Sequence, residues 1–371
     1  MSTDTIITSK ALGQRVAKAR CAAGLTQSEL AQRIKLDRTA ISRIESGDRR
    51  LEALELVAIS RSTGVPAEWL LQSVPIVASY RGRPEADQLG VRVEALIATL
   101  ERDLMLLLDL GALKAPQDRG ELPTPRSPDE AETAATRLRE RMGWSDGPIT
   151  DLLRASETAG LYSIVEDLGP DLPDGIYRPV ASVGIAWING SSPTGRRRFT
   201  VAHELGHHVF QDEYAVDWPE TGDEGTERII NAFAVHLLLP GMGLKRRWEE
   251  LTNDYAEPRD RAILIAAEFG ASWSAVLAQL GRVGLLSLPE QSAFRQEPPR
   301  RGDYVGLATA FPEDISAPRL SPRLAAAVVA AYRRGGISQT RALELLRGTI
   351  EEDELPEPAT VPLAAFSSDL G

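Results

Sequence analysis

Apolar residues recur at intervals of three and four along most of the chain, which is the period of helices that bury one face. Gly24, Gly47 and Gly64 lie where such patterns stop, as expected of helix ends and turns. Two stretches, Leu161–Val165 and Val183–Asn189, are apolar runs typical of buried strands. We therefore predict a mainly α protein with an α+β core and a short sheet. The amino-terminal helices are predicted at Ser9–Cys21, Gln27–Ile34, Arg38–Ser46, Ala53–Ser62 and Ala67–Gln72.

The chain has 371 residues, enough for two or three domains. Its carboxy-terminal part is the least informative: residues 266–286 have the outline of two helices joined by a turn, and residues 320–349 predict two more helices. The predicted segments are 1–75, five short helices; 76–128, a connector helix and a proline-rich linker; 129–245, a core with the two strands; 246–350, a helical module; and 351–371, an acidic tail.

The connector helix has an apolar seam formed by Val93, Ile97, Leu100, Leu104 and Leu107, which step by four and three. Such a seam predicts a homodimer through residues 93–107. The alternative is that the helix lies against the rest of the chain, because further leucines make it apolar all round. After it, residues 116–128 contain four prolines and predict an exposed linker.

All four histidines of the chain lie between positions 203 and 236, and two of them frame the sequence H-E-x-x-H at residues 203–207. On a helix, the spacing of four residues places His203 and His207 one turn apart on one face, where a single Zn²⁺ can bind both. Glu204 lies beside them and is the candidate general base for a hydrolytic reaction. The pattern therefore predicts a metal centre that performs hydrolysis.

A catalytic zinc usually has a third protein ligand. Glu227 begins a second amphipathic helix, residues 227–240, and Asn231 follows one turn later on the same face. A carboxylate ligand followed by a side chain that orients a ligand histidine is a common pairing at metal sites. Glu224 is a competing ligand, but it lies in a glycine-rich stretch without a defined face.

Residues 198–207 (RFTVAHELGH) and 227–240, with Glu227, Asn231 and Pro240, resemble the ImmA/IrrE family of bacterial and phage zinc metallopeptidases. The order of elements across residues 130–240 is also similar to that of the family. The resemblance implies a small zincin-like (gluzincin-like) metallopeptidase domain. It also implies that His203, His207 and Glu227 bind Zn²⁺, with Mn²⁺ as a second metal to consider, and that Glu204 is the general base.

The other two histidines depart from the family pattern, since relatives often have Glu at position 236 and an apolar residue at position 208. His208 follows a ligand directly and points to another side of the helix, so we expect a structural or surface role. His236 either faces the cleft and stabilises an oxyanion or forms a hydrogen bond in the core. Tyr214 is a further candidate donor to an oxyanion.

The amino-terminal segment has its own signature. Its first seventy-five residues contain eleven Lys and Arg against eight Asp and Glu, in a chain of net charge −11. Thr26 and Glu29 form a capping box at the start of the second helix. Two short helices joined by a tight turn predict a helix-turn-helix motif. Residues 10–73 resemble the Xre/Cro-type DNA-binding domains.

In such a domain the amino-terminal residues of the second motif helix contact base edges in the major groove of an operator. Arg38, Thr39, Ser42 and Arg43 are then the candidate DNA readers, and Gln27 binds phosphate or supports them. The second two-helix unit, residues 266–286, lacks such a basic face apart from Arg282. We predict that it is a packing module.

Composition narrows the class of protein further. A hydrophobic fraction of 43% is enough for packed cores, and the single Cys21 excludes disulfides within the chain. The sequence contains neither a signal peptide nor a run of about eighteen apolar residues, which predicts a cytoplasmic protein without a membrane partner. The family resemblance implies a bacterial or phage-encoded protein, which its DNA-binding segment would associate with the nucleoid.

Two functions fit these features. The first is a DNA-bound metallo-endopeptidase that cleaves a transcriptional repressor of the Xre type, as the resemblance implies, in a stress or prophage response. Cleavage of its own chain at residues 116–128 is a variant of this function. The second is a transcription factor that senses a ligand or metal through a peptidase-like domain and does not cleave. The complete set of two histidines and two glutamates favours the first function, because a sensor has no use for Glu204.

Overall fold

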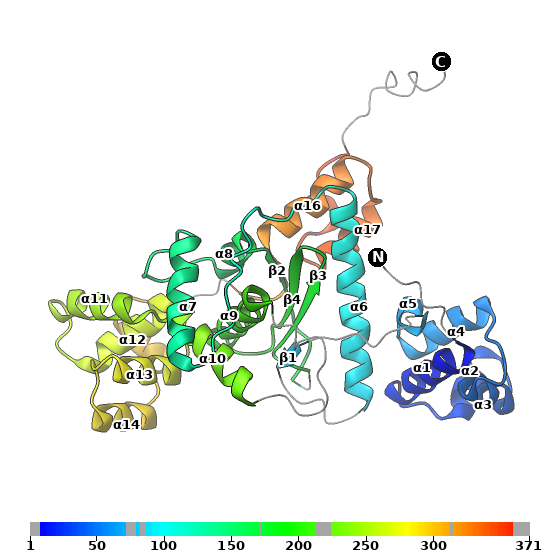
Figure 1. The fold of residues 1–371 in the computed structure, drawn as a ribbon, viewed down its shortest axis with the longest axis horizontal. Helices are drawn as coiled ribbons and strands as arrows, with labels where there is room; N and C mark the ends of the chain where they lie inside the picture. Colours follow the sequence, from blue (N-terminus) through cyan, green and yellow to red (C-terminus); the bar gives the residue numbers. More distant parts are fainter. Residues whose placement is uncertain are drawn as a thin grey trace, which may run out of the picture.

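The computed structural model describes residues 8–71, 79–81, 87–170, 172–211, 224–311 and 315–358. Helices predominate, and one small sheet lies near the middle of the molecule (Figure 1). This confirms the predicted mainly α fold, including the five amino-terminal helices and both predicted strands.

The amino-terminal domain is a bundle of five short helices with defined ends. Thr8, Thr26 and Asp37 accept hydrogen bonds from backbone N–H groups at the starts of the first three helices, and Gly47 ends the third in a left-handed conformation. Buried apolar side chains from all five helices form its core. The helices are α1 (Ser9–Ala22), α2 (Gln27–Ile34), α3 (Arg38–Ser46), α4 (Ala53–Thr63) and α5 (Ala67–Leu71).

The connector helix α6 (Asp87–Asp109) belongs to two hydrophobic cores. Near its start, Val91, Ala95 and Ala98 pack into the core of the amino-terminal domain. The residues of its leucine-rich seam pack instead into the core on one face of the sheet. The seam is therefore buried inside its own chain and does not form the predicted surface for a second copy. The seam consists of Val93, Ile97, Leu100, Leu104 and Leu107.

The sheet has five strands in the order β1-β3-β4-β2-β5. The pair β2 and β4 is parallel, and the other neighbours are antiparallel. Sequence patterns missed β3, since its Gly175 and Pro179 are residues that strands disfavour. The strands are β1 (Ser79–Arg81), β2 (Leu161–Glu166), β3 (Gly175–Val180), β4 (Val183–Asn189) and β5 (Arg319–Leu320).

The central strands are buried on both faces, and alternate side chains enter two different cores. In β4, Ala186 and Ile188 join the larger core, whereas Ile185 and Trp187 join the core that contains α6. The helices whose residues form the larger core include α7 (Pro128–Arg141), α8 (Leu152–Thr158), α9 (Thr194–Phe210) and α10 (Glu224–Leu238). The sheet thus separates the helices α9 and α10 from the connector helix.

The carboxy-terminal region is divided between the two cores and is not the single module predicted for residues 246–350. Its first helices extend the larger core without a break at residue 245, whereas its last two pack with α6 (Figure 1). Asp103 of α6 forms ion pairs with Arg341 and Arg347, which hold the carboxy-terminal helices against α6. The helices are α11 (Gly241–Thr252), α12 (Pro258–Phe269), α13 (Trp273–Arg282), α14 (Leu288–Gln296), α15 (Arg301–Gly306), α16 (Pro322–Arg333) and α17 (Gln339–Leu346), before a short 3-10 turn, η2 (Glu352–Glu354).

The predicted two-helix unit at 266–286 corresponds to α12 and α13, which meet at an angle of 114°. Within the described residues, no single helix is both long and apolar enough to cross a membrane, although this bent pair passes the same test of length and composition. Arg282 is paired with Glu132 and Asp129 of α7. These contacts agree with a packing role for the unit.

Residues 116–128 do not form the free linker that their prolines predict. The N–H of Leu122 donates to the carbonyl of Val209 at 2.9 Å, and the Thr124 hydroxyl donates to the carbonyl of Phe210 at 3.3 Å. Asp118 pairs with Arg141 of α7. The segment therefore packs against the end of α9, because a backbone N–H and a side-chain hydroxyl donate to carbonyls that the helix terminus leaves open.

A buried carboxylate makes stability depend on pH. Glu157 of α8 is fully buried, and its Oε1 accepts the N–H groups of Arg323 and Leu324 at the start of α16. Burial raises the pKa of the Glu157 carboxyl to about 7, although these N–H groups lower it. The folded state therefore keeps a proton that the unfolded chain loses near its ordinary pKa of 4.5.

It follows that stability falls as the pH rises from about 4.5 to about 7, because the folded state binds more protons than the unfolded state over this range. We predict that Glu157→Gln, which keeps an acceptor oxygen but cannot ionise, removes this fall. Melting temperatures at pH 5 and pH 8 test the prediction, with exposed Glu140→Gln as the control. A wild-type melting temperature that rises across this range relative to Glu157→Gln would contradict it.

Candidate metal centre and nucleic-acid interface

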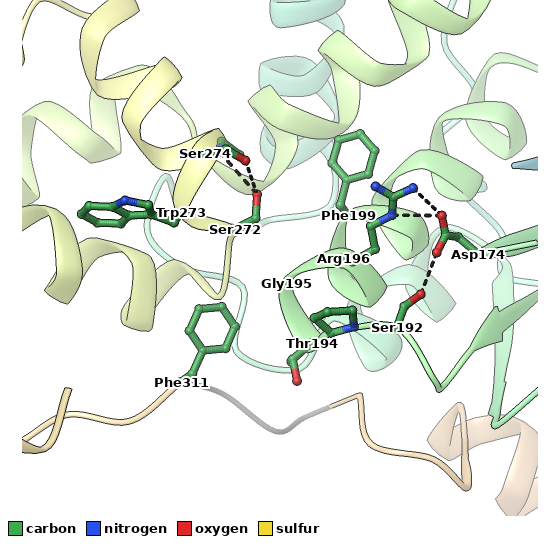
Figure 2. Close-up of a pocket in the computed structure, with 12 residues that line it drawn as sticks. Asp174, Ser192, Thr194, Gly195, Arg196, Phe199, Ser272, Trp273, Ser274 and Phe311 are labelled. Atoms are coloured by element: carbon green, nitrogen blue, oxygen red, sulfur yellow. Dashed lines mark hydrogen bonds and ion pairs between the residues drawn. The ribbon is translucent and has the colours of Figure 1, made fainter. Parts of the chain in front are cut away.

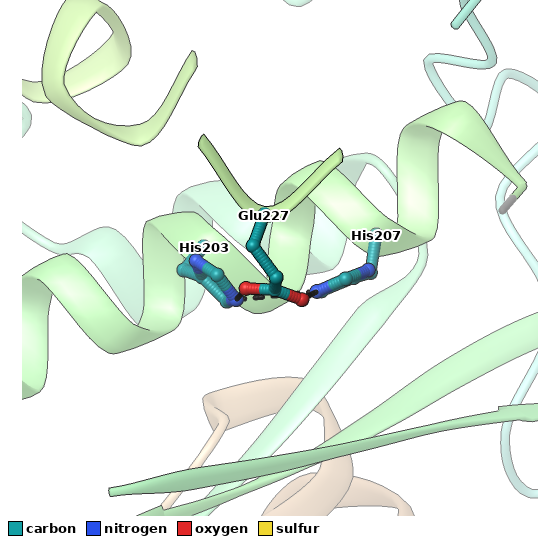
Figure 3. Close-up of side chains that lie close together, drawn as sticks. All are labelled: His203, His207 and Glu227. Carbon is teal, nitrogen blue, oxygen red and sulfur yellow. Dashed lines mark hydrogen bonds and ion pairs between the residues drawn. The ribbon is translucent and has the colours of Figure 1, made fainter. Parts of the chain in front are cut away.

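Helices α9 and α10 bring three candidate metal ligands together. His203 and His207 lie one turn apart on α9, and Glu227 reaches them from the first turn of α10 (Figure 3). Both histidines are buried, and the carboxylate is partly buried. Among the described residues, these three form the one group of His, Cys, Asp or Glu with the spacing of a metal site.

The candidate ligand atoms of the three residues lie close together. The Nε2 atoms of His203 and His207 are 3.1 Å apart. The Nε2 atom of His203 lies 3.5 Å from Oε2 of Glu227, and that of His207 lies 3.6 Å from Oε1. Ligands about 2.0–2.1 Å from a tetrahedral zinc are separated by about 3.3 Å. Two imidazoles and a carboxylate at this spacing are a donor set that fits Zn²⁺.

Asn231 orients the first ligand. The Nδ1 atom of His203 lies 3.2 Å from Oδ1 of Asn231, one turn beyond Glu227 on α10. Because an amide oxygen only accepts hydrogen bonds, Nδ1 is the protonated nitrogen of His203. Its Nε2 atom then presents a lone pair to the other two ligands, as metal coordination requires.

Glu204 is fully buried on the same helix. The start of β3 leaves room for it: a methyl group added to Gly175 would lie 2.5 Å from Oε1 of Glu204. The same methyl group would lie even closer to Cγ2 of Thr200, so any other residue at position 175 would force one or both of these side chains to move. Sequence analysis missed this contact, because it depends on a strand that the pattern did not reveal.

The two extra histidines have structural partners. The Tyr177 hydroxyl lies 3.1 Å from Nδ1 of His208, whose Nε2 lies 2.9 Å from the carbonyl of Ala159. Burial lowers the pKa of His208 to about 4, so the ring is neutral and bridges these groups. Tyr177 of β3 also stacks on the His207 ring at 6.3 Å, which the sequence did not predict.

Of the two roles predicted for His236, its contacts favour the hydrogen bond in the core. The amide of Gln279 donates to its Nδ1 at 2.9 Å, and Arg282 and Glu132 lie beside it. These partners belong to α7 and α13, which do not contribute metal ligands. Tyr214 and the side chain of Glu224 lie outside the described residues.

The third helix of the amino-terminal domain presents the predicted DNA readers to solvent. Arg38, Thr39, Ser42 and Arg43 are exposed, whereas Ile41 and Ile44 of the same helix are buried. The helix therefore has a fixed inner face and a free polar outer face, the arrangement that groove contacts require.

Gln27 supports this helix from α2. Its amide donates to Oε2 of Glu45 at 2.8 Å, and Arg20 of α1 forms an ion pair with the same carboxylate at 2.6 Å. The three side chains join α1, α2 and α3. This favours the supporting role that the sequence left open for Gln27 over a contact with phosphate.

Comparison with known proteins identifies two types of domain in the chain. Residues 172–280 match the family model of the IrrE N-terminal-like domain, and residues 16–70 match that of a helix-turn-helix domain. The chain joins a helix-turn-helix domain to an IrrE-like domain. The matched part of the IrrE-like domain runs from β3 to α13, so it includes both helices that contribute candidate metal ligands and continues past residue 245. No curated protein matches the chain.

We predict that Asn231→Ala lowers affinity for Zn²⁺ by about 10–100-fold, because His203 loses the acceptor that orients it. Asn231→Asp keeps an acceptor oxygen and should bind zinc more tightly than the alanine variant. Competition with a chromophoric chelator measures both affinities, and melting curves confirm that the variants fold. Equal zinc affinity in all three proteins would show that Asn231 has no such role.

Proposed function

We propose that the protein is a DNA-binding transcriptional regulator whose IrrE-like domain is a zinc metallo-endopeptidase. The observation that carries the proposal is the buried Glu204 beside the triangle of His203, His207 and Glu227. A site that only bound metal for structure would use a fourth protein ligand and would have no need of a buried carboxylate at this place.

Zn²⁺ held by these three side chains would supply a Lewis acid that activates water and polarises a peptide carbonyl. Glu204 accepts a proton from the attacking water and returns it to the leaving amine. Its burial favours this role, because exclusion of solvent strengthens its interaction with a proton at the site. Gly175 has no side chain and so leaves space for this carboxylate.

Because the IrrE-like domain is fused to a helix-turn-helix domain, we infer that its substrate is also a DNA-bound protein. We propose a transcriptional repressor of the Xre type, cleaved in a stress or prophage response. Cleavage of the chain itself at residues 116–128 is disfavoured, because that segment is hydrogen-bonded along the end of α9. A protease requires an extended and accessible segment.

A second function keeps the DNA-binding role without cleavage, with the IrrE-like domain as a metal or ligand sensor. The observation in its favour is the connector α6, whose residues belong to the cores of both domains. A change of packing in one core would then alter the packing of the other.

We predict that Glu204→Gln retains zinc binding and fold but lowers cleavage by a factor of about 100–10,000, since the amide cannot accept the proton. His203→Ala should lose the metal as well. Wild type and both variants are incubated with Zn²⁺, with Mn²⁺ or without metal, alone and with Xre-type repressors encoded nearby, and mass spectrometry identifies the products. Cleavage that persists undiminished in Glu204→Gln would rule out the peptidase function.

We predict that Arg43→Ala weakens binding of the protein to its selected DNA. If Arg43 reads a base, the loss is about 1–3 kcal/mol and specificity relaxes at one position; if it binds phosphate, the salt slope falls by about one. Selection from a random duplex library, followed by fluorescence anisotropy at several salt concentrations, measures both. Arg61→Ala removes an exposed charge from α4 as a control. Equal effects of the two variants would exclude a specific role for α3.

A further inference from the structure

A large pocket lies at the start of the metal helix α9. It has a volume of about 1000 Å³, at the upper end of the range of ligand-binding pockets. Figure 2 shows Phe199 and Phe311 on two sides of the first turn of α9, with the start of α13 facing them. The pocket is therefore built where α9, α13 and the segment after α15 meet.

The polar side chains on one wall of the pocket are paired with one another. Arg196 donates to Oδ2 of Asp174 at 2.9 Å, and the Ser192 hydroxyl donates to Oδ1 of the same carboxylate at 2.6 Å. The charges of Arg196 and Asp174 offset each other. An anionic ligand would have to compete with Asp174 for the guanidinium.

The rest of the lining is mainly apolar and aromatic, with the hydroxyl side chains of Thr194, Ser272 and Ser274 among it. Phe199, Trp273 and Phe311 line it together with Pro193 and Ala275. The indole N–H of Trp273 is bonded to the carbonyl of Phe294 at 2.8 Å, which fixes the ring against α14. Rigid aromatic walls without an available charge suit a large apolar side chain.

Phe199, which lines the pocket, also contacts the candidate metal centre. Its ring lies 6.2 Å from the ring of His203, which follows one turn later on α9. One turn of helix advances about 5.4 Å, and an extended peptide covers this distance with about two residues. A side chain in the pocket would therefore belong to a residue close to the bond held at the metal.

We propose that this apolar pocket selects a large apolar side chain, preferably aromatic, within about two residues of the bond that the protein cleaves. The inference rests on the proposed peptidase function and names the feature by which its polypeptide substrate is recognised. Binding in the pocket does not require Glu204, so the pocket can be tested separately from cleavage.

The first experiment measures binding without cleavage. The full chain carrying Glu204→Gln is titrated with N-acetyl-phenylalaninamide and with N-acetyl-alaninamide, and saturation-transfer NMR gives the affinities. We expect the phenylalanine probe to bind at least about tenfold more tightly than the alanine probe, because the apolar ring is transferred from water into the pocket. Equal affinities would overturn the proposal.

Matched tryptophan substitutions locate the binding. Ala275→Trp fills the pocket and should lower its affinity for the phenylalanine probe at least about tenfold. Ala278→Trp places the same side chain on an exposed position of the same helix and should change nothing. Exposed Ser274, which also lines the pocket, gives a second filling variant, Ser274→Trp, should Ala275→Trp fail to fold. Probe binding unaffected by a folded filling variant would overturn the proposal.

The second experiment uses the wild-type chain with Zn²⁺ and a library of peptides varied at every position. We expect cleaved sequences to be enriched in Phe, Tyr, Trp or Leu within two residues of the cleaved bond, and Ala275→Trp to abolish the enrichment. Cleavage without this preference would overturn the proposal that the pocket selects the substrate. Selective binding of the phenylalanine probe without any cleavage supports the pocket and counts against the proposed peptidase function alone.

Discussion

The candidate metal centre depends on close contact between α9 and α10, since each helix contributes candidate ligands that the other lacks. Gly206 lies where the two helices meet, and a methyl group there would come within 3.0 Å of Ile230 and Phe233. A glycine inside a helix costs about 1 kcal/mol relative to alanine. The chain accepts this cost, and the short separation lets Glu227 reach both His203 and His207.

Much of the site could be predicted because it is local. The spacing of His203 and His207 is a property of one helix, and the pair Glu227 and Asn231 is a property of another. The same holds for the exposed face of α3, where buried Ile41 and Ile44 set the phase of the helix. Helical period alone determines these neighbours.

The rest depends on contacts between residues far apart in the chain. Gly175 meets Glu204, and Tyr177 meets His207 and His208, only because β3 pairs with β4 and packs under α9. The prolines of residues 116–128 predicted a linker, but backbone groups at the end of α9 hold that segment. The apolar seam of α6 has the spacing of a coiled coil. An apolar face of the sheet in the same chain buries that seam as well as a second helix would.

The connector α6 has 23 residues, and the residues that enter the core of the amino-terminal domain alternate with those that enter the core on one face of the sheet. The helix-turn-helix domain and the sheet therefore lie on two sides of α6, and the helix fixes their relative position through its width and not through its length (Figure 1). If the domain binds DNA through α3 as proposed, α6 would hold the candidate metal centre at a fixed position relative to the duplex. A second protein bound at a neighbouring site would then meet that centre at an effective concentration fixed by the length of DNA between them, whatever its concentration in solution.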